Sequence, residues 1–260
     1  MSTIFLTSLN TEGYNVYGRR FLQEFARMSS NDTMLYVLFE GNIPSDISSI
    51  AKNIITLPFL NKDLHLFINK YKYFVEANGL KVDIFKKDKK KHIKIFKNQK
   101  FNAFKYARRP FAVLTILEHI SKNTEFLIWT DSDLRCKKKF SINDLNKFMP
   151  NTDQLLSYLA IENSSFDSGF IAFNLRHYLF KDFLYRMIDV YKSGEIFSFP
   201  EWHDNYIWAQ IRNEFYKKFS VKYKNLAQNI TDIEHIYENT DLGEYFDHLK
   251  GKSKKIENPL

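Results

Sequence analysis

Cysteine is nearly absent from the sequence, and this scarcity bears on where the protein works. Cys136 is the only cysteine among 260 residues, so no disulfide can form within the chain. Chains without disulfides suit a reducing compartment. The first ten residues, MSTIFLTSLN, lack the basic segment and the long apolar segment of a signal peptide. No apolar run approaches the length needed to cross a bilayer. We therefore expect a cytoplasmic protein, and peripheral attachment to the inner membrane face stays open.

Acidic residues are also scarce relative to basic ones. Asp and Glu number 30 and Lys and Arg number 38, which gives a formal net charge of +8. This excess favours a polyanionic partner, and nucleic acid, an anionic membrane surface and a phosphorylated small molecule all qualify. Apolar residues, by contrast, are plentiful, since they make up 44% of the chain. The chain can therefore bury a sizeable core, and its length suits one large domain.

Strand and helix patterns alternate along the chain and predict an α/β fold, with a mostly parallel sheet covered by helices. The predicted strands are the apolar runs at residues 3–9, 34–39, 54–57, 126–130, 155–160 and 169–173. The predicted helices have apolar residues at helical spacing and cover residues 16–28, 64–77, 101–120, 178–191 and 204–215. Pro110 interrupts the third of these helices, where we expect a helix start or a kink.

The most basic window of the chain, KVDIFKKDKKKHIKIFKNQK, covers residues 81–100. A charge run of this kind is usually a solvated loop or a solvated helix face, and we expect one here. The alternative is a surface patch that binds an anionic membrane or a glycolipid acceptor.

Two carboxylates follow the strongest strand pattern. The stretch FLIWTDSDLRCKKKF places Asp131 and Asp133 directly after residues 126–130 and before a basic cluster. In open α/β sheets ligands bind at the carboxyl ends of strands. Two carboxylates one residue apart repel each other unless a cation is near, and a hard divalent ion accepts carboxylates together with phosphate oxygens. The alternative is a pair of turn or N-cap aspartates, because Ser141 and Asn143 indicate a helix start nearby.

Three further polar segments are ambiguous when taken singly. Asp167-Ser168-Gly169 opens a strand, where a small Ser-Gly pair lets the backbone approach a ligand or simply forms a turn. Glu201-Trp202-His203-Asp204-Asn205 precedes a helix, either as a polar cluster beside an exposed Trp or with Asp204 as an N-cap. His248 begins the segment HLKGKSK. Its imidazole is a good ligand for Mn²⁺, the glycine permits a tight turn, and a following lysine can reach the oxygens of a phosphate. A frayed basic terminus is the alternative there.

Taken in order, these segments resemble the metal-dependent glycosyltransferases of the GT-A fold, and most of all glycosyltransferase family 8. That family has an Asp-x-Asp after an apolar strand, as in 126–133, and then a Ser/Ala-Gly strand ending in Asn, as in 167–174. A polar acidic-Gln-acidic segment opens a later helix, where this chain has His203-Asp204-Asn205. The family's C-terminal His-Phe-x-Gly-x-x-Lys matches His248, Gly251 and Lys254 in spacing. The resemblance spans nearly the whole chain, although Asp167 stands where Asn is usual and Leu249 replaces Phe.

The resemblance implies a GT-A-like fold and assigns roles to individual residues. A divalent ion, Mn²⁺ or Mg²⁺, would be held by Asp131, Asp133 and His248. Contacts to the donor are expected from Thr7, Tyr14, Arg108, Arg109, Asp131, Ser132, Ser168, Gly169, Gly251 and Lys254. The residues expected at the reacting groups are Asp167, His203 and Asp204. The sequence does not decide whether Arg108 or Arg109 braces Asp131 or the donor. The positive charge around the aspartates suits a site for a diphosphate.

The implied reaction transfers a sugar from a nucleotide-diphosphate donor to a hydroxyl group. The expected partners are a nucleotide sugar, with UDP favoured, and a glycan or glycolipid acceptor in surface polysaccharide, lipooligosaccharide or glycoprotein assembly, with no nucleic acid. Family 8 enzymes retain anomeric configuration; if this chain inverts it, Asp204 is the candidate base. We expect a nucleotide-binding half at 1–135, an acceptor-side half at 136–230 and a C-terminal tail at 231–260 that closes over the donor.

Two other classes of function stay open. A nucleotidyltransferase would usually show a Gly-rich, basic loop after the first strand, whereas residues 10–15 contain one Gly and no Lys or Arg. A nucleic-acid-binding protein would use the basic residues between Lys81 and Arg109, but no helix-turn-helix, zinc or RNA-binding signature accompanies them.

Overall fold

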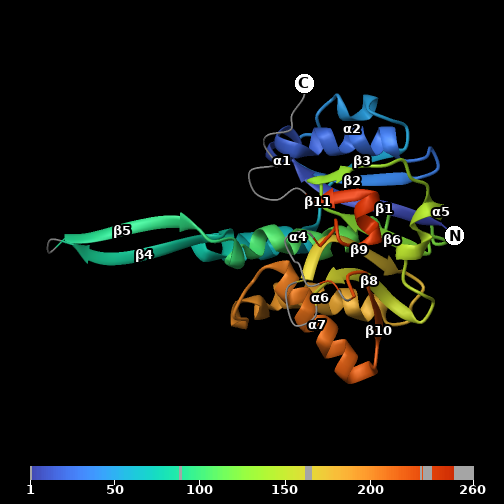
Figure 1. Ribbon diagram of the computed structural model, residues 1–260. Helices are drawn as coiled ribbons and strands as arrows, with labels where there is room; N and C mark the ends of the chain where they lie inside the picture. Colours follow the sequence, from blue (N-terminus) through green and yellow to red (C-terminus); the bar gives the residue numbers. More distant parts are fainter. Residues whose placement is uncertain (1, 88–89, 162–165, 229, 231–235, 249–260) are drawn as a thin grey trace.

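A seven-stranded sheet forms the centre of the protein (Figure 1). The computed structural model describes residues 2–87, 90–161, 166–228, 230 and 236–248. The strands lie in the spatial order β10 (Lys222–Asn225), β8 (Gln154–Ala160), β9 (Phe166–Asn174), β6 (Phe126–Thr130), β1 (Thr3–Asn10), β2 (Met34–Glu40) and β3 (Ile54–Pro58). Only β9 runs opposite to the others, because it pairs antiparallel with both β6 and β8 while the remaining pairs are parallel. The expected mixed and mostly parallel sheet is confirmed.

Helices and a small second sheet cover the two faces. Residues of β6 alternate between two buried clusters: Leu127 and Trp129 pack with α4, whereas Ile128 packs with α2. This alternation follows from the two-residue period of a strand buried on both faces. The longer helices are α2 (Arg19–Met28) on one face and α3 (Lys62–Tyr71), α4 (Ala103–Ile116), α6 (Phe180–Ser193) and α7 (Asp204–Phe219) on the other. Among the described residues no helix is both long and apolar enough to span a bilayer.

Short helical segments connect these elements. They are α1 (Thr11–Gly13), η1 (Tyr14–Gly18), η2 (Ile47–Ser49), η3 (Val75–Asn78), η4 (Gln99–Phe101), α5 (Ile142–Leu145), η5 (Asn146–Phe148), η6 (Glu195–Ser198) and η7 (Asp241–Glu244). The expected helix at 16–28 therefore begins earlier, at Thr11, and passes through a π-helical turn at η1 before α2.

A two-stranded sheet joins the C-terminal part of the chain to the residues after β6. In it β11 (Phe246–His248) pairs antiparallel with β7 (Leu134–Cys136), and His248 lies opposite Leu134. Phe246 is completely buried and its ring lies 5.1 Å from Phe140 and 6.2 Å from Phe170, centroid to centroid. Burial of this ring holds β11, and therefore His248, beside the end of β6.

The basic window 81–100 is neither a loop nor a helix, so that expectation is wrong. It forms an antiparallel hairpin of β4 (Leu80–Lys87) and β5 (Lys90–Lys97) that projects from the body (Figure 1). Apolar residues alternate with charged residues in both strands, since Val82 and Ile84 flank Asp83, and Ile93 and Ile95 flank Lys94. This two-residue period indicates a strand, and the density of charge concealed it.

Pro110 lies inside α4 and does not begin it. The helix begins at Ala103, where the Asn102 side chain accepts a hydrogen bond from the backbone N–H of Lys105. The expected helix start at Pro110 is therefore wrong. A proline in a helix interior removes one backbone donor. Pro110 is buried within α4, which packs against β1 and α6.

Replacing Phe246 by alanine tests whether β11 depends on this ring. We expect Phe246→Ala to lower the free energy of unfolding by about 3–5 kcal/mol, the usual loss for a fully buried Phe. Phe219→Ala is the matched control, because Phe219 is 39% exposed and should cost far less. Urea unfolding of the two variants measures the difference. Equal losses would show that the Phe246 ring does not hold β11.

Candidate functional site

The ends of two central strands bring acidic residues together. Asp131 follows β6, and Thr130 at the end of β6 pairs with Phe170 of β9. Because β9 runs in the opposite direction, its first residues, including Asp167, extend past the end of β6. The backbone N–H of Asp131 donates to the carbonyl of Gly169 at 2.9 Å, which fixes the two segments against each other. The edge of the sheet therefore presents carboxylates from both strands.

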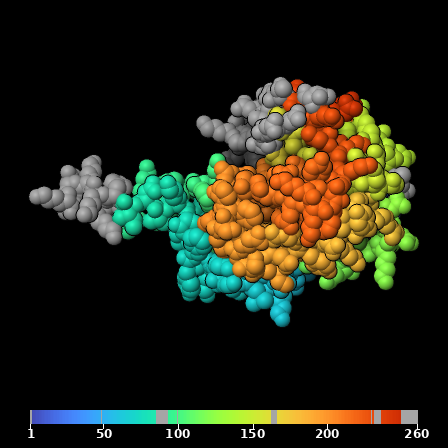
Figure 2. All heavy atoms as spheres, turned by 90° about the horizontal axis from the view of Figure 1, so that it is seen from below, coloured from blue at the N-terminus to red at the C-terminus, as the bar shows by residue number. Residues whose placement is uncertain are grey.

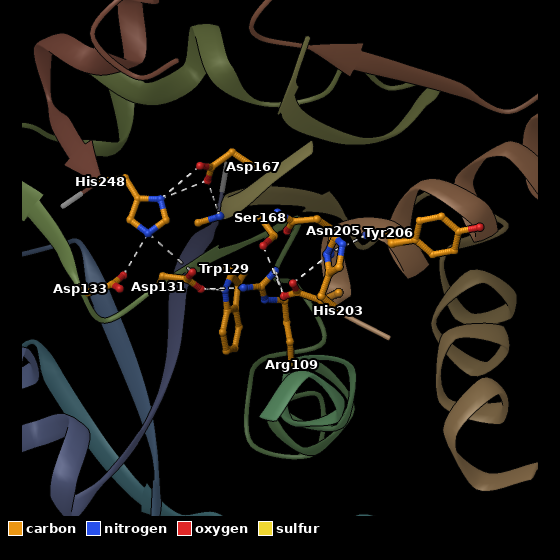
Figure 3. A network of polar contacts seen from close by, with 12 residues as sticks. Arg109, Trp129, Asp131, Asp133, Asp167, Ser168, His203, Asn205, Tyr206 and His248 are labelled. Atoms are coloured by element: carbon orange, nitrogen blue, oxygen red, sulfur yellow. Dashed lines mark hydrogen bonds and ion pairs between the residues drawn. The ribbon is translucent and has the colours of Figure 1, made fainter. Parts of the chain in front are cut away.

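His248 completes a group of three side chains that can hold a metal ion (Figure 3). Its Nε2 lies 3.2 Å from Oδ1 of Asp133 and 4.0 Å from Oδ2 of Asp131. One ligand atom from each of the three residues lies within 4.8 Å of the other two. Two carboxylates and an imidazole form a donor set that suits Mn²⁺. The residues present therefore fit a divalent ion.

Asp167 fixes the orientation of the His248 ring. Both carboxylate oxygens of Asp167 lie 3.2 Å from Nδ1 of His248, on the side of the ring away from Asp133 (Figure 3). A carboxylate behind a ligating histidine is a common feature of metal sites, where it sets the tautomer and the ring direction. Burial lowers the pKa of His248, but hydrogen bonds and charges from Asp133 and Asp167 outweigh this effect and raise the pKa to about 10.

Arg109 of α4 links the carboxylate pair to α7. Its Nη2 donates to Oδ1 of Asp131 at 2.7 Å, and its Nη1 lies 2.6 Å from Oδ2 of Asp204. The guanidinium also covers the Trp129 ring at 5.0 Å from the centroid, and the indole Nε1 donates to Oδ1 of Asp131 at 2.8 Å. One oxygen of Asp131 is thus held by Arg109 and Trp129, which leaves the other on the side of His248.

Negative charge is crowded at this site. Burial raises the pKa of Asp131, and the neighbouring charges of Asp133 and Asp204 raise it further, while Arg109 and His248 oppose them. A divalent cation would relieve this crowding, since an opposite charge favours the ionised carboxylates.

Gly169 leaves space that the site needs. A Cβ atom at this position would lie 2.8 Å from the hydroxyl oxygen of Tyr237 and 3.0 Å from both Oδ1 of Asp167 and Nδ1 of His248. Any larger residue would therefore push against the pair that orients the imidazole. This contact gives a physical reason for the Ser-Gly pair at the start of β9.

One lysine of the basic cluster that follows the two aspartates is engaged at the surface. Nζ of Lys138 pairs with Glu244 at 3.3 Å, and further along the chain Nζ of Lys147 pairs with Asp241 at 2.9 Å. These pairs tie the surface near α5 to η7, the segment that leads into β11. A diphosphate site lined by the whole cluster stays a prediction.

Three residues expected at the donor are buried or paired within the protein. Arg108 pairs with Glu40, with Nη2 2.9 Å from Oε2, so Arg109 is the arginine that braces Asp131. Thr7 is completely buried within β1. Tyr14 is 1% exposed, with its hydroxyl 2.7 Å from Asp46, so that its ring is enclosed in the core where a base-stacking ring would need an open face.

The segment before α7 differs from both sequence interpretations. His203, and not Asp204, is the N-cap, because its Nδ1 accepts from the backbone N–H of Tyr206 at 3.3 Å. The other ring nitrogen, Nε2, lies 2.6 Å from Glu201. Trp202 is 8% exposed, so the expected exposed Trp is wrong. Asp204 is 4% exposed and accepts from Ser168 Oγ at 3.3 Å.

The remaining expected residues divide into two groups. Ser132 is 8% exposed and Ser168 is 6% exposed, and both lie among the carboxylates. Gly251 and Lys254 lie outside the described residues.

Two tyrosines at the site were missed in the sequence. The Tyr17 hydroxyl lies near Ser132, and burial together with the charges of Asp133 and Asp131 raises its pKa to about 12. The Tyr237 ring packs edge-on to His248 at 5.7 Å between centroids, and burial raises its pKa well above the usual range. No sequence spacing relates either tyrosine to the carboxylates. The contact of Trp129 with Asp131 could have been predicted, because residues two apart lie on the same side of a strand.

Comparison with protein-family models gives no match, and comparison with curated proteins gives none. Solved structures do match. The glycosyltransferase GlyE of Streptococcus pneumoniae TIGR4 is 13% identical with a TM-score of 0.51, and the match covers 86% of this chain and 46% of that chain. The galactosyltransferase LgtC, solved with donor and acceptor sugar analogues, is 12% identical with a TM-score of 0.48, covering 95% and 87%.

The likeness to GlyE concerns the fold. This chain spans about half the length of the GlyE structure. The mostly parallel seven-stranded sheet with helices on both faces matches the fold of the GlyE structure. The chain therefore has the GT-A fold that its sequence predicted.

Proposed function

We propose that this protein is a glycosyltransferase that moves a sugar from a nucleotide-diphosphate donor to a hydroxyl acceptor. The observation that carries the proposal is the convergence of Asp131, Asp133 and His248, from two distant segments of the chain, at the strand ends of a GT-A sheet. In open α/β sheets this edge is where ligands bind. The resemblance to family 8 favours UDP as the nucleotide and a glycan or glycolipid in surface assembly as the acceptor.

The three residues would hold Mn²⁺ or Mg²⁺ against the donor diphosphate. When bound, such an ion supplies positive charge that stabilises the leaving diphosphate as the glycosidic bond breaks. The chain's own residues prepare this site. Arg109 and Trp129 fix Asp131 through one oxygen, and Asp167 turns Nε2 of His248 towards Asp133. Asp167 is thus a positioning residue in this proposal.

The contacts of Asp204 favour retention of anomeric configuration. A general base needs a lone pair that faces the acceptor hydroxyl. In Asp204, Oδ2 is engaged by Arg109 and Ser168 and Oδ1 accepts the backbone N–H of Asn205 at 2.8 Å. Both carboxylate oxygens of Asp204 are therefore held by neighbouring protein groups. We therefore assign Asp204 to positioning Arg109, and the reaction to the retaining class.

We keep the division of the chain into parts within this proposal. Residues 1–135 would bind the nucleotide and residues 136–230 would face the acceptor, although one continuous sheet runs through both. His203 and Glu201 would lie on the acceptor side. The tail at 231–260 would bring His248, with Gly251 and Lys254, to the diphosphate.

Replacing Asp133 tests the metal site. Asp133→Asn keeps the shape of the side chain and removes one charge, which ends both the attraction to His248 and the repulsion of Asp131. Because these effects oppose each other, we expect only a modest fall in the metal-free melting temperature. Stabilisation by UDP-sugar with Mn²⁺ should disappear, and the transfer rate should fall roughly hundredfold or more. Thermal shift and product assays measure the two effects. Asp241→Asn, at a side chain 71% exposed, should behave like the parent. Unchanged Mn²⁺ dependence in Asp133→Asn would remove Asp133 from the site.

Metal affinity should depend on pH because His248 must lose a proton to bind an ion. Its pKa in the metal-free protein, about 10, lies above the ordinary value for histidine. Below pH 10 each ion bound at the site therefore displaces a proton, and affinity should rise by up to about tenfold per pH unit between about pH 6 and 9. Calorimetry in buffers of different ionisation enthalpy counts the protons released. His248→Ala should weaken binding and flatten this dependence; an equally steep dependence in that variant would assign the proton to another group.

The stereochemistry of the product tests the role of Asp204. The anomeric proton coupling in the product, measured by NMR, should show the same configuration as in the donor. Asp204→Asn should lower both the melting temperature and the transfer rate, since Arg109 loses a buried ionic partner. An inverted product, together with loss of the acidic limb of the pH–rate profile in Asp204→Asn, would instead identify Asp204 as the base.

A further inference from the structure

The hairpin of β4 and β5, residues 80–97, is an arm that stands apart from the body of the protein. Figure 1 shows it extending well beyond the helices, and Figure 2 shows the coloured part of the hairpin projecting from the body of the protein. A two-stranded hairpin on its own is marginally stable in water. An arm that packs against little of its own protein therefore suggests a partner.

The arm carries most of the excess charge of the protein. Residues 80–97 contain eight lysines and two aspartates, against a formal net charge of +8 for the whole chain. The same segment contains no arginine. The rest of the chain is therefore close to neutral, and the polyanionic partner that the composition indicated belongs to the arm.

One face of the arm is aliphatic and exposed. Val82 lies opposite Ile95, and Ile84 lies opposite Ile93, so the four side chains share one face, which we term the isoleucine face. Ile84, Ile93 and Ile95 are 56%, 64% and 61% exposed. A soluble monomer rarely leaves such neighbouring apolar side chains open to water unless they bind something.

Other exposed apolar side chains gather near the root of the arm. Tyr73 is 86% exposed, and Phe74 and Val75 are 37% and 40% exposed, directly before β4. Of the thirteen large apolar side chains that are exposed among the described residues, eight lie between residues 60 and 95. Apolar exposure and positive charge thus occupy the same part of the molecule.

We propose that the arm binds an anionic lipid surface. The isoleucine face would enter the boundary between headgroups and acyl chains, while the lysines pair with lipid phosphates. Apolar burial combined with attraction to anionic lipids is the general basis of peripheral membrane binding.

The composition of the arm argues against other occupants. Nucleic-acid surfaces favour arginine and stacked aromatic rings. The arm has no arginine and its isoleucine face is aliphatic, while its two phenylalanines, Phe85 and Phe96, occupy the alternate positions of the strands. A second copy of the chain would bring one highly basic arm against another, and like charges repel. An anionic membrane offers both the negative charge and the apolar interior that the arm requires.

The root of the arm is joined to the candidate site. The Asn98 N–H donates to the Gly79 carbonyl at 2.7 Å and closes the hairpin, and the Trp202 N–H donates to the Lys100 carbonyl at 2.8 Å. Lys100 also pairs with Glu201, which contacts His203. From the start of α4 to Arg109 is six residues, on the order of 9 Å along the helix.

This connection extends the proposed function, on which the following step rests. An arm held at a membrane would keep the acceptor side of the site next to the lipid surface. The acceptor class is then a sugar linked to lipid.

Vesicle flotation tests the arm directly. The probes are phosphatidylcholine vesicles with and without about one third phosphatidylglycerol. The parent protein should float with the anionic vesicles, less so as salt is raised, and stay unbound with pure phosphatidylcholine. Neutralising Lys94 and Lys97 (Lys94→Gln with Lys97→Gln) should weaken binding roughly fivefold per lysine. Replacing the isoleucine face (Ile84→Ser, Ile93→Ser and Ile95→Ser together) should weaken it roughly tenfold or more.

Matched variants elsewhere on the surface provide the controls. Lys217→Gln with Lys218→Gln removes the same charge from α7, and Ile43→Ser with Tyr216→Ser removes exposed apolar groups from the body; both should bind like the parent. Circular dichroism and melting temperature confirm that each variant is folded.

Three results would overturn the proposal. They are no binding of the parent to anionic vesicles, equal binding by the isoleucine variant, or tighter binding to duplex DNA than to vesicles. Hydrolysis of a soluble nucleotide sugar by the arm variants separates this proposal from the transferase. Loss of vesicle binding with hydrolysis intact supports the arm alone, whereas vesicle binding without any hydrolysis leaves the arm proposal standing and counts against the transferase.

Discussion

Repulsion between carboxylates at the end of β6 is the constraint around which the rest of the site is arranged. Asp131 and Asp133 are one residue apart, and Asp167 and Asp204 lie close by. Burying this much negative charge is unfavourable unless cations accompany it. Arg109 balances one side of the group and His248 the other. Hydrogen bonds and charges from Asp133 and Asp167 outweigh the burial of His248 and raise its pKa to about 10.

The topology of the sheet and the C-terminal segment both bring further residues to the two carboxylates. The reversed direction of β9 places its first residues beside the last residue of β6, so Asp167 and Gly169 reach the carboxylate pair. The pairing of β11 with β7 then delivers an imidazole from more than a hundred residues away in the sequence. The anchor is apolar, since the Phe246 ring holds β11 in place while His248, two residues on, faces the site.

Local sequence patterns were enough to predict most strands and helices and the residue types that could bind a metal ion. The run 126–130 coincides with β6 because all five residues are buried, and the Asp-Ser-Asp after it needs only the end of that strand. Contacts between residues that are far apart in the sequence could not be predicted from such local patterns. The choice between Arg108 and Arg109 depends on which way one turn of α4 faces, and only the packing of α4 on the sheet decides it. Tyr14 and Tyr17 lie in one π-helical turn, and the fold buries the first and brings the second to the carboxylates.

In the part of the chain that the structure describes, the positive charge of the protein is concentrated on the arm and not at the candidate site. A net charge of +8 indicated a polyanionic ligand, and a diphosphate was one candidate. Yet among the described residues the site itself is rich in aspartate, and Lys138, from the basic cluster that follows Asp133, pairs with Glu244 at the surface. A diphosphate at this site would therefore depend on a bound ion for most of its positive partner. The lysines concentrate instead on the arm, where they stand beside exposed isoleucines. Since α4 joins the root of the arm to Arg109, one buried helix fixes the distance between the two regions, and a surface that holds the arm also sets the position of the site.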